Sequence, residues 1–295
     1  MQLSIKNLSK TYSNGVQALK NVSLTIEQGM FGLLGPNGAG KSSLMRTIAT
    51  LQNADTGSIM LDDINALENP QAIREKLGYL PQDFGLYPRI SAEVMLDHIA
   101  QMKGVGSRNE RKQLVANLLE KVNLYKDRKK ALGTYSGGMR QRFGIAQALV
   151  GNPSLIIVDE PTAGLDPTER NRFYNLLSEI GENTIVLLST HIVEDVSTLC
   201  SRMAIICEGE LLMEGTPADG LAVLKDKIYS KSIDKQELPA YKEKYQVIST
   251  KLKEGQLSLR VQSDTNPGDG FEPATPNLED VYFTHISTKI DPVTL

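Results

Sequence analysis

The sequence has no tryptophan, only two cysteines and no long uncharged apolar run. Cys200 and Cys207 are too few and too close together for a disulfide framework, so we expect small core residues in a reducing compartment. No stretch approaches the roughly 20 apolar residues of a membrane span, and the first residues lack the apolar segment of a signal peptide. We therefore expect a cytoplasmic chain without a direct membrane span, which reaches a membrane only by docking onto another protein.

An excess of basic charge is also missing, because the formal net charge is −3 and the pI is about 5.8. These values disfavour a nucleic-acid-binding surface as the main function, so we predict no nucleic acid partner. The 295 residues, of which 40% are hydrophobic, suffice for one large domain with an appendage or for two domains.

One stretch matches the phosphate-binding pattern G-x-x-x-x-G-K-[ST] at every fixed position. It comprises Gly35, Pro36, Asn37, Gly38, Ala39, Gly40, Lys41 and Ser42. Residues 30–34 before it indicate a buried strand, and residues 41–51 have helical spacing. In this context backbone N–H groups converge on a β-phosphate, Lys41 reaches the β- and γ-phosphates, and Ser42 reaches Mg²⁺. A chance match would arise in only about 1% of chains of this length, so a fortuitous glycine-rich turn is a weak alternative.

Two residues near strand ends are candidates for which the local sequence leaves an alternative open. Tyr12 precedes a turn at residues 13–15 between two segments that alternate like antiparallel strands. Its ring could stack on an adenine or pack on a neighbour. Gln82 follows a short strand that stops at Pro81, at an edge where α/β sheets bind ligands. Gln82 could contact a metal or the attacking water, although a solvated loop glutamine is the simpler local interpretation.

Residues 91–149 change to a helical pattern, which predicts a helical insertion at about residues 86–150 in an α/β core. Val94, Met95 and Ile99 mark one face of the first helix, and His98 lies on or beside that apolar stripe. We expect His98 to be a structural residue rather than a ligand.

The segment Ser136, Gly137 and Gly138 precedes the last helix of this insertion. Ser136 suits a helix N-cap, and the two glycines leave backbone N–H groups uncovered at the positive end of the helix. A plain Ser-Gly-Gly cap is common, but the phosphate loop in the same chain favours a second anion site.

Two adjacent carboxylates end the apolar run of residues 155–160, which is typical of a strand buried on both faces. Asp159 suits Mg²⁺ held through water beside Ser42, and Glu160 suits polarising an attacking water. Because two ionised carboxylates repel each other, a nearby cation would explain their placement. An acidic strand end in solvent is the alternative.

Two further candidates lie beyond these carboxylates. Asp166 precedes Pro167 and suits the N-cap of the next helix as well as a functional role. Residues 184–190 indicate another buried strand, and His191 follows it, where its ring could hydrogen-bond a γ-phosphate and Glu160. Of the three histidines, only His191 falls where the chemistry is expected.

The composition becomes lysine-rich and strand-like after Leu224. We predict a core domain at residues 1–224 and a small α+β appendage at residues 225–295, with a turn at Glu254. A terminal helix is expected to begin near Asn277 and pack back onto the chain.

The order of these motifs closely resembles the ATP-binding subunits of ABC transporters over about residues 2–224. The matching positions are Tyr12 for adenine stacking, Gly35 to Ser42 with the adjoining Ser43 for the Walker A loop, Gln82 for the Q-loop, Ser136 to Gly138 for the signature, Asp159 and Glu160 for Walker B, Asp166 for the D-loop and His191 for the switch histidine. The resemblance implies ATP and Mg²⁺ as cofactors. It also implies that Glu160, His191 and Gln82 are catalytic, that Ser42, Gln82 and Asp159 contact Mg²⁺, and that the other positions bind ATP.

The signature departs from the commoner Leu-Ser-Gly-Gly-Gln, since Tyr135 and Met139 flank its core here. Together with the Leu-Glu-Asp-Val-Tyr stretch near the C-terminus, it is similar to the subgroup that exports drugs, antibiotics, lipids or polysaccharides. The resemblance implies an α/β P-loop fold with an antiparallel β-subdomain, and a head-to-tail homodimer or a paired ATPase subunit. It also implies an integral membrane permease partner at the inner face of the cell membrane, received by a groove near residues 84–88.

Two other classes stay open on the sequence. A soluble ATPase of the same type without a transporter, for example in metal-cluster assembly, would share the nucleotide site. A non-hydrolysing nucleotide-binding regulatory module is the second class, and the presence of Glu160 and His191 disfavours it.

Overall fold

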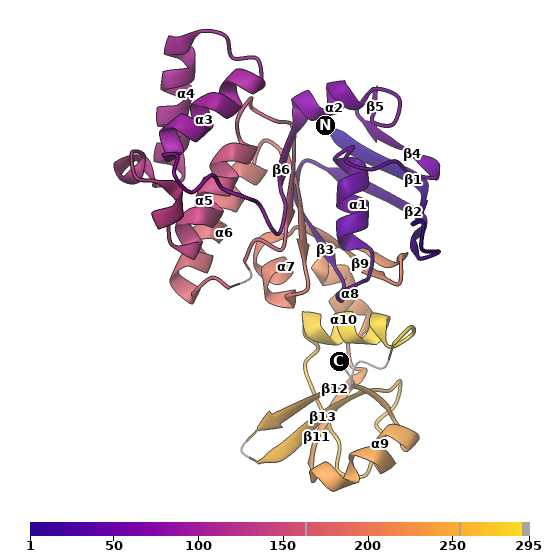
Figure 1. The fold of residues 1–295 in the computed structure, drawn as a ribbon. Coiled ribbons are helices and arrows are strands. Elements are labelled where there is room, and N and C mark those ends of the chain that lie inside the picture. The colour runs from indigo at the N-terminus through magenta and orange to yellow at the C-terminus, as the bar shows by residue number, and fades with distance from the viewer. Residues whose placement is uncertain (163, 254, 291–295) are drawn as a thin grey trace.

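A computed structural model describes residues 1–162, 164–253 and 255–290 (Figure 1). The chain opens with a four-stranded antiparallel sheet in the order β2-β1-β4-β5. Its strands are β1 (Gln2–Thr11), β2 (Gln17–Glu27), β4 (Thr56–Leu61) and β5 (Ile64–Asn65). Buried Ile5 pairs with Leu24 on one side and Ile59 on the other, as the alternating pattern predicts. The predicted antiparallel β-subdomain is confirmed.

A second sheet of six strands, in the order β10-β9-β3-β8-β7-β6, forms the centre of the molecule. Its strands are β3 (Gly29–Leu34), β6 (Leu77–Leu80), β7 (Leu155–Asp159), β8 (Ile185–Thr190), β9 (Arg202–Cys207) and β10 (Glu210–Gly215). Neighbours from β9 to β6 run parallel, and only the edge strand β10 is antiparallel. The carboxyl ends of β3, β6, β7 and β8 therefore meet at one edge, where α/β sheets bind ligands.

Helices cover the central sheet and extend beyond β6 as a separate arm (Figure 1). Around the sheet lie α1 (Lys41–Ile48), α2 (Pro70–Lys76), α6 (Pro167–Gly181) and α7 (Val193–Leu199). The arm contains α3 (Ala92–Met102), α4 (Arg108–Lys121) and α5 (Gly137–Ala148), with short 3₁₀ helices η1 (Tyr125–Asp127) and η2 (Leu132–Thr134) between α4 and α5. The predicted helical insertion is present.

The buried face of α3 matches the predicted one only in part, because Met95 and Ile99 pack against the core as predicted. Val94 and His98 are exposed, whereas Ala92, Leu96 and Ala100 are buried. Each of these three residues lies four positions from the next, so they form one stripe of the helix. The small side chains of Ala92 and Ala100 at the two ends of the stripe let α3 lie close to its neighbours. The structural role expected for His98 is wrong.

The C-terminal part forms a third sheet, in the order β12-β13-β11-β14. It follows α8 (Pro217–Val223) and contains β11 (Ile228–Ile233), η3 (Lys235–Glu237), α9 (Leu238–Lys244), β12 (Gln246–Lys253), β13 (Gln256–Gln262), β14 (Glu272–Pro273) and α10 (Leu278–Ile286). Helix α10 packs on α8, β9 and β10 as well as on β12, and so connects this sheet with the central one. The turn predicted at Glu254 and residues 291–295 lie outside the described residues.

Within the described ranges, no helix is both long and apolar enough to cross a bilayer.

Candidate functional site

The phosphate loop connects β3 with α1, as the sequence predicts. At Gly35 a Cβ atom would lie 2.3 Å from the carbonyl oxygen of Ile206. At Gly40, where φ is +107°, a Cβ would lie 2.5 Å from the carbonyl oxygen of Ala18. Both positions therefore require glycine, because any side chain would displace neighbouring backbone. Gly40 also has no side chain to cap α1, so the first N–H groups of the helix stay available to an anion.

Lys41 is the first residue of α1 and is only 5% exposed. Its Nζ donates hydrogen bonds to the carbonyl oxygens of Gly35 at 2.7 Å and Pro36 at 3.1 Å. It also lies 3.6 Å from Oε1 of Glu160. Burial lowers the pKa of Lys41, and the nearby carboxylates of Glu160 and Asp159 oppose that shift. The side chain thus links the phosphate loop with the end of β7.

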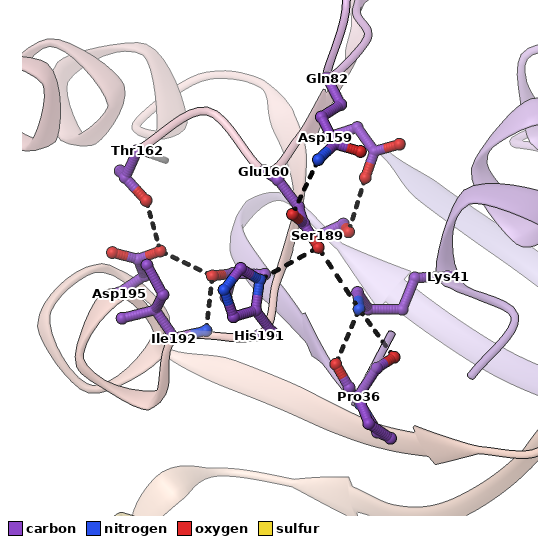
Figure 2. Close-up of polar contacts among 12 residues, drawn as sticks. Pro36, Lys41, Gln82, Asp159, Glu160, Thr162, Ser189, His191, Ile192 and Asp195 are labelled. Carbon is purple, nitrogen blue, oxygen red and sulfur yellow. Dashed lines mark hydrogen bonds and ion pairs between the residues drawn. The ribbon is translucent and has the colours of Figure 1, made fainter. Parts of the chain in front are cut away.

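Glu160 is the residue on which the strand ends converge (Figure 2). Gln82, after β6, donates from Nε2 to Oε2 of Glu160 at 3.1 Å. His191, after β8, has its Nδ1 3.2 Å from Oε1 of the same carboxylate. The structure therefore brings Lys41, Gln82, Glu160 and His191 together at the edge where the sequence predicts them.

Glu160 also has an unusual backbone, with φ at +47°. Non-glycine residues adopt this left-handed region rarely, and when they do the surrounding structure must hold them there. The backbone N–H of Glu160 donates to the carbonyl oxygen of Ser189 at 3.0 Å, across to β8. The turn directs the carboxylate away from the sheet and toward Lys41.

Asp159 is buried at 3% exposure, and its carboxylate has a different partner from that of Glu160. Its Oδ1 accepts a hydrogen bond of 2.8 Å from the Ser189 hydroxyl, its register partner on β8. Sequence reasoning missed Ser189, because the register between β7 and β8 leaves no local signal in either strand.

A cavity of about 640 Å³ opens in front of these residues. Predicted residues that line it are Tyr12, Asn37 to Ser43, Gln82 and Glu160. Lys20, Glu208 and Gly209 line it as well, and no local motif identifies them as site residues. With a cation, a carboxylate and a glycine-rich helix N-terminus around it, the cavity suits a polyphosphate.

Tyr12 contributes both its hydroxyl and its ring to this region. The hydroxyl lies 2.9 Å from Oγ of Ser43 and donates to Oε1 of Gln52 at 3.1 Å. These contacts fix the side chain of Tyr12, a residue that lines the cavity. Stacking of its ring on an adenine stays a prediction.

The predicted second anion site lies apart from this cavity. None of its residues, Ser136, Gly137 and Gly138, is among the described residues that line the cavity. Ser136 caps α5, and its Oγ accepts a hydrogen bond of 3.2 Å from the N–H of Met139. Gly137 lines a second cavity, of about 280 Å³, together with Gln82 and the segment of Phe84, Leu86 and Pro88. A cavity is therefore present at the segment where a groove is predicted, and it shares Gln82 with the first cavity. Its role in receiving a membrane partner stays a prediction.

Asp166 likewise does not contribute to the described lining of the phosphate cavity. It caps α6, where its Oδ1 accepts a hydrogen bond of 2.9 Å from the N–H of Glu169. The Glu169 carboxylate in turn lies 3.2 Å from Nε of Arg142 on α5. The two predicted sites outside the cavity are thereby connected.

A further carboxylate, Asp195 on α7, was also missed, although it is completely buried near the site. It accepts hydrogen bonds from the hydroxyls of Thr162, Tyr174 and Thr190. A carboxylate on a short helix is usually interpreted as a solvated surface residue. The sequence around Asp195 therefore does not indicate that this side chain is buried.

A phosphate loop beside carboxylates at the carboxyl edge of parallel strands defines a P-loop nucleotide hydrolase. Comparison with known proteins makes this class specific: the family model described as "ABC transporter" matches residues 19–163. The chain is 36% identical over 219 residues to the linearmycin resistance ATP-binding protein LnrL of Bacillus subtilis (strain 168), covering 74% of this chain and 70% of LnrL. It is 32% identical over 296 residues to the uncharacterized ABC transporter ATP-binding protein YxlF of the same organism, covering 95% of this chain and 98% of YxlF.

A solved structure agrees with these relatives. The dimeric ATP-binding cassette MJ0796, in a post-hydrolysis state bound to ADP and Pi, matches with a TM-score of 0.67 and 29% identity over 72% of this chain and 98% of that chain. The chain therefore belongs to the ATP-binding proteins of the ABC transporter family, and its activity is ATP hydrolysis. The predicted fold and activity are confirmed.

Proposed function

We propose that this ATPase drives export through a separate integral membrane permease, in a head-to-tail pair with a second ATPase subunit. One observation carries the proposal. The phosphate cavity contains Lys41 and Glu160, whereas the glycine-rich N-terminus of α5 opens outside it. A triphosphate in the cavity would leave one side free for such an N-terminus from a second chain.

Within the cavity, Lys41 would bind the β- and γ-phosphates through its ammonium group. Glu160 would polarise the attacking water, because it is the carboxylate in the cavity lining that lies beside Lys41. Gln82 and His191 hold the two oxygens of Glu160 from opposite sides and would orient it toward the water. Tyr12 would stack on the adenine.

The residues present fit Mg²⁺ bound together with the nucleotide. Among the described residues no group of three or more His, Cys, Asp or Glu side chains could hold a metal alone. Mg²⁺ commonly takes one or two carboxylates plus substrate phosphates and waters, and Asp159, Ser42 and Gln82 offer hard oxygen ligands of that kind. When bound, Mg²⁺ would supply positive charge to neutralise the charge that develops on the phosphate during hydrolysis.

Ser136, Gly137 and Gly138 would bind the triphosphate of the partner subunit, and Asp166 would lie at the same interface. The dimeric form of the related cassette MJ0796 supports this arrangement. Closure on ATP and opening after hydrolysis would then supply the movement that the permease uses.

The second cavity would receive the permease, at the inner face of the cell membrane. It lies between the segment after Gln82 and the start of α5, so a docked element would contact both halves of the nucleotide machinery. Export of drug-like compounds is supported by relatives named for linearmycin resistance in Bacillus subtilis and doxorubicin resistance in Mycobacterium tuberculosis.

Mixing two inactive variants tests the head-to-tail pair. Lys41→Met disables the phosphate loop, and Gly137→Asp places a repelling carboxylate where the partner's phosphates would lie. Each variant alone should hydrolyse ATP slowly, whereas their mixture should exceed both, because one composite site in each mixed dimer is intact. A mixture no more active than its components, with mixed dimers verified by differential tags, would contradict the arrangement.

Co-purification from solubilised membranes tests the permease. A tagged Glu160→Gln chain should retain a membrane subunit, and a cysteine at position 86 should cross-link to it. Recovery of the ATPase without any membrane protein would instead favour a stand-alone ATPase.

A further inference from the structure

Asp195 carries an unusual set of contacts for a residue outside the nucleotide cavity. Its side chain is fully buried, yet it is a carboxylate. Its Oδ2 accepts hydrogen bonds of 2.7 Å from the hydroxyls of both Thr162 and Thr190. Its Oδ1 accepts one of 2.5 Å from the hydroxyl of Tyr174. Three short bonds to one buried carboxylate compensate its removal from water and fix each donor in one position.

Two of the three donors, Thr162 and Thr190, lie in the chain segments that carry Glu160 and His191, the two residues in contact at the site (Figure 2). Thr162 follows Glu160 by two positions, and Thr190 immediately precedes His191. The hydroxyl of Thr190 also accepts the N–H of Ile192 at 2.9 Å, so the chain is held on both sides of His191. Tyr174 comes from α6 and adjoins neither residue.

We propose that Asp195 is a positioning residue, which holds Glu160 and His191 at their working separation. It does so by binding both the segment that follows Glu160 and the segment that precedes His191. The inference rests on the proposed roles of those two residues in hydrolysis. Glu160 and His191 end different strands, and their 3.2 Å contact depends on the relative placement of both chain segments. Asp195 is the common anchor of these segments.

Two observations explain why such an anchor is needed. Glu160 has a left-handed backbone, which persists only when the surrounding structure determines it. His191 is 44% exposed on its side chain, so packing alone does not immobilise its ring. A misplacement of about 1 Å can lower turnover by on the order of a hundredfold.

Isosteric removal of single hydroxyls tests the inference. Thr162→Val and Thr190→Val should each lower kcat by about 10- to 100-fold, while the Kd for ATP stays within about threefold. Thr162→Ser and Thr190→Ser, which retain the hydroxyl, should return kcat to within about threefold of the parent. Tyr174→Phe is the matched control, because it removes a bond to the same carboxylate from a segment that adjoins neither Glu160 nor His191. Its kcat should stay within about threefold of the parent.

Thermal unfolding separates positioning from stability. We expect all three single variants to lower Tm by similar amounts, whereas only the two threonine variants lower kcat. A kcat loss in Tyr174→Phe equal to that in Thr190→Val, or losses that follow Tm across the series, would overturn the inference in favour of a purely structural network. Full activity of both valine variants would overturn it as well.

Parallel variants keep this result apart from the proposed function. If Glu160→Gln and His191→Ala are inactive while both valine variants are fully active, only the positioning inference fails. If Glu160→Gln itself hydrolyses ATP at the parent rate, the proposed roles at the site fail first. Asp195→Ala, if it folds, should lower kcat at least as far as either threonine variant.

Discussion

Two helix N-termini of this chain have glycine-rich sequences suited to an anion, and their surroundings differ. Helix α1 begins after Gly40, inside a cavity of about 640 Å³ that Lys41 and Glu160 also line. Helix α5 begins after Ser136, whose own hydroxyl accepts one of the exposed N–H groups. The nearby Arg140 donates to the carbonyl oxygens of Tyr135 and Gly133 rather than pointing at an anion.

The difference shows how one chain can contribute to two sites. The α1 end has a cation, a loop and a carboxylate from its own chain, which suffices to bind a nucleotide. The α5 end has backbone donors but, among the described residues, no share in that cavity. Variants at the first end should therefore affect ATP binding or hydrolysis directly, and variants at the second should change hydrolysis only through a partner.

The largest effect is expected from Glu160→Gln, at the α1 side. Loss of the polarising carboxylate should lower ATP turnover by at least ~100-fold. ATP affinity should be nearly unchanged, because the amide keeps the volume of the side chain and Lys41 remains. Steady-state hydrolysis and fluorescent-nucleotide binding would measure the two quantities. Turnover at the parent rate would remove Glu160 from the mechanism.

Lys41→Met should weaken ATP binding by at least about tenfold, since a buried charged donor to the phosphates is lost. The same change should stabilise the nucleotide-free protein. Burial lowers the pKa of Lys41 below its ordinary 10.5, so the charged form costs stability below the folded-state pKa. That cost fades as the pH rises from the folded-state pKa to 10.5.

Denaturant titrations of the parent and Lys41→Met between neutral and alkaline pH would measure this difference in unfolding free energy. It should be largest near neutrality and shrink toward high pH. A variant less stable than the parent at neutral pH would show that the contacts of Lys41 to Gly35 and Pro36 outweigh the cost of its burial.

Gly137→Asp should lower turnover about tenfold or more while leaving ATP affinity of the isolated chain unchanged. A Cβ at position 137 meets nothing within 4 Å, and a carboxylate at a helix N-terminus is favourable for folding. Any loss must therefore come from a group outside the chain. Gly137→Asn is the uncharged control and should lose less, and an equal loss in both would point to shape rather than charge.

The smallest effect is expected from Ser136→Ala, which removes the α5 cap. It should lower the unfolding free energy by about 1 kcal/mol. Ser91→Ala is the matched control, because Ser91 occupies the N-cap of α3 without a side-chain cap bond. That variant should stay within about 0.5 kcal/mol of the parent. Equal losses of unfolding free energy in both variants would mean that the Ser136 cap bond does not stabilise α5.

Much of the site could be predicted because its members follow strands. Glu160 and His191 each come directly after a strand of the central sheet, and Gln82 follows one by two positions. Parallel strands bring such positions to one edge. Ser189 and Asp195 could not be predicted. Ser189 meets Asp159 through strand register, and Asp195 lies on a short helix whose buried side is set by packing on α6 and β8.

Val94 shows the same limit in the helical arm. It was expected on the buried face, but Leu96 takes that place, flanked by Ala92 and Ala100 at spacings of four. An apolar residue on a helix can face solvent when small residues on another face of the helix permit closer packing there.

The sequence alone determined the local elements of this protein: the strand, loop and helix that bind phosphate, the acidic strand end and the glycine-rich helix start. These features depend on residues within a few positions of one another, through backbone sterics, capping and short-range periodicity. Only the tertiary structure decided that β8 lies between β3 and β7, so that His191 and Ser189 reach the carboxylates of β7. It also decided that Asp195 binds both segments, because contacts between residues far apart in the chain depend on strand order and register.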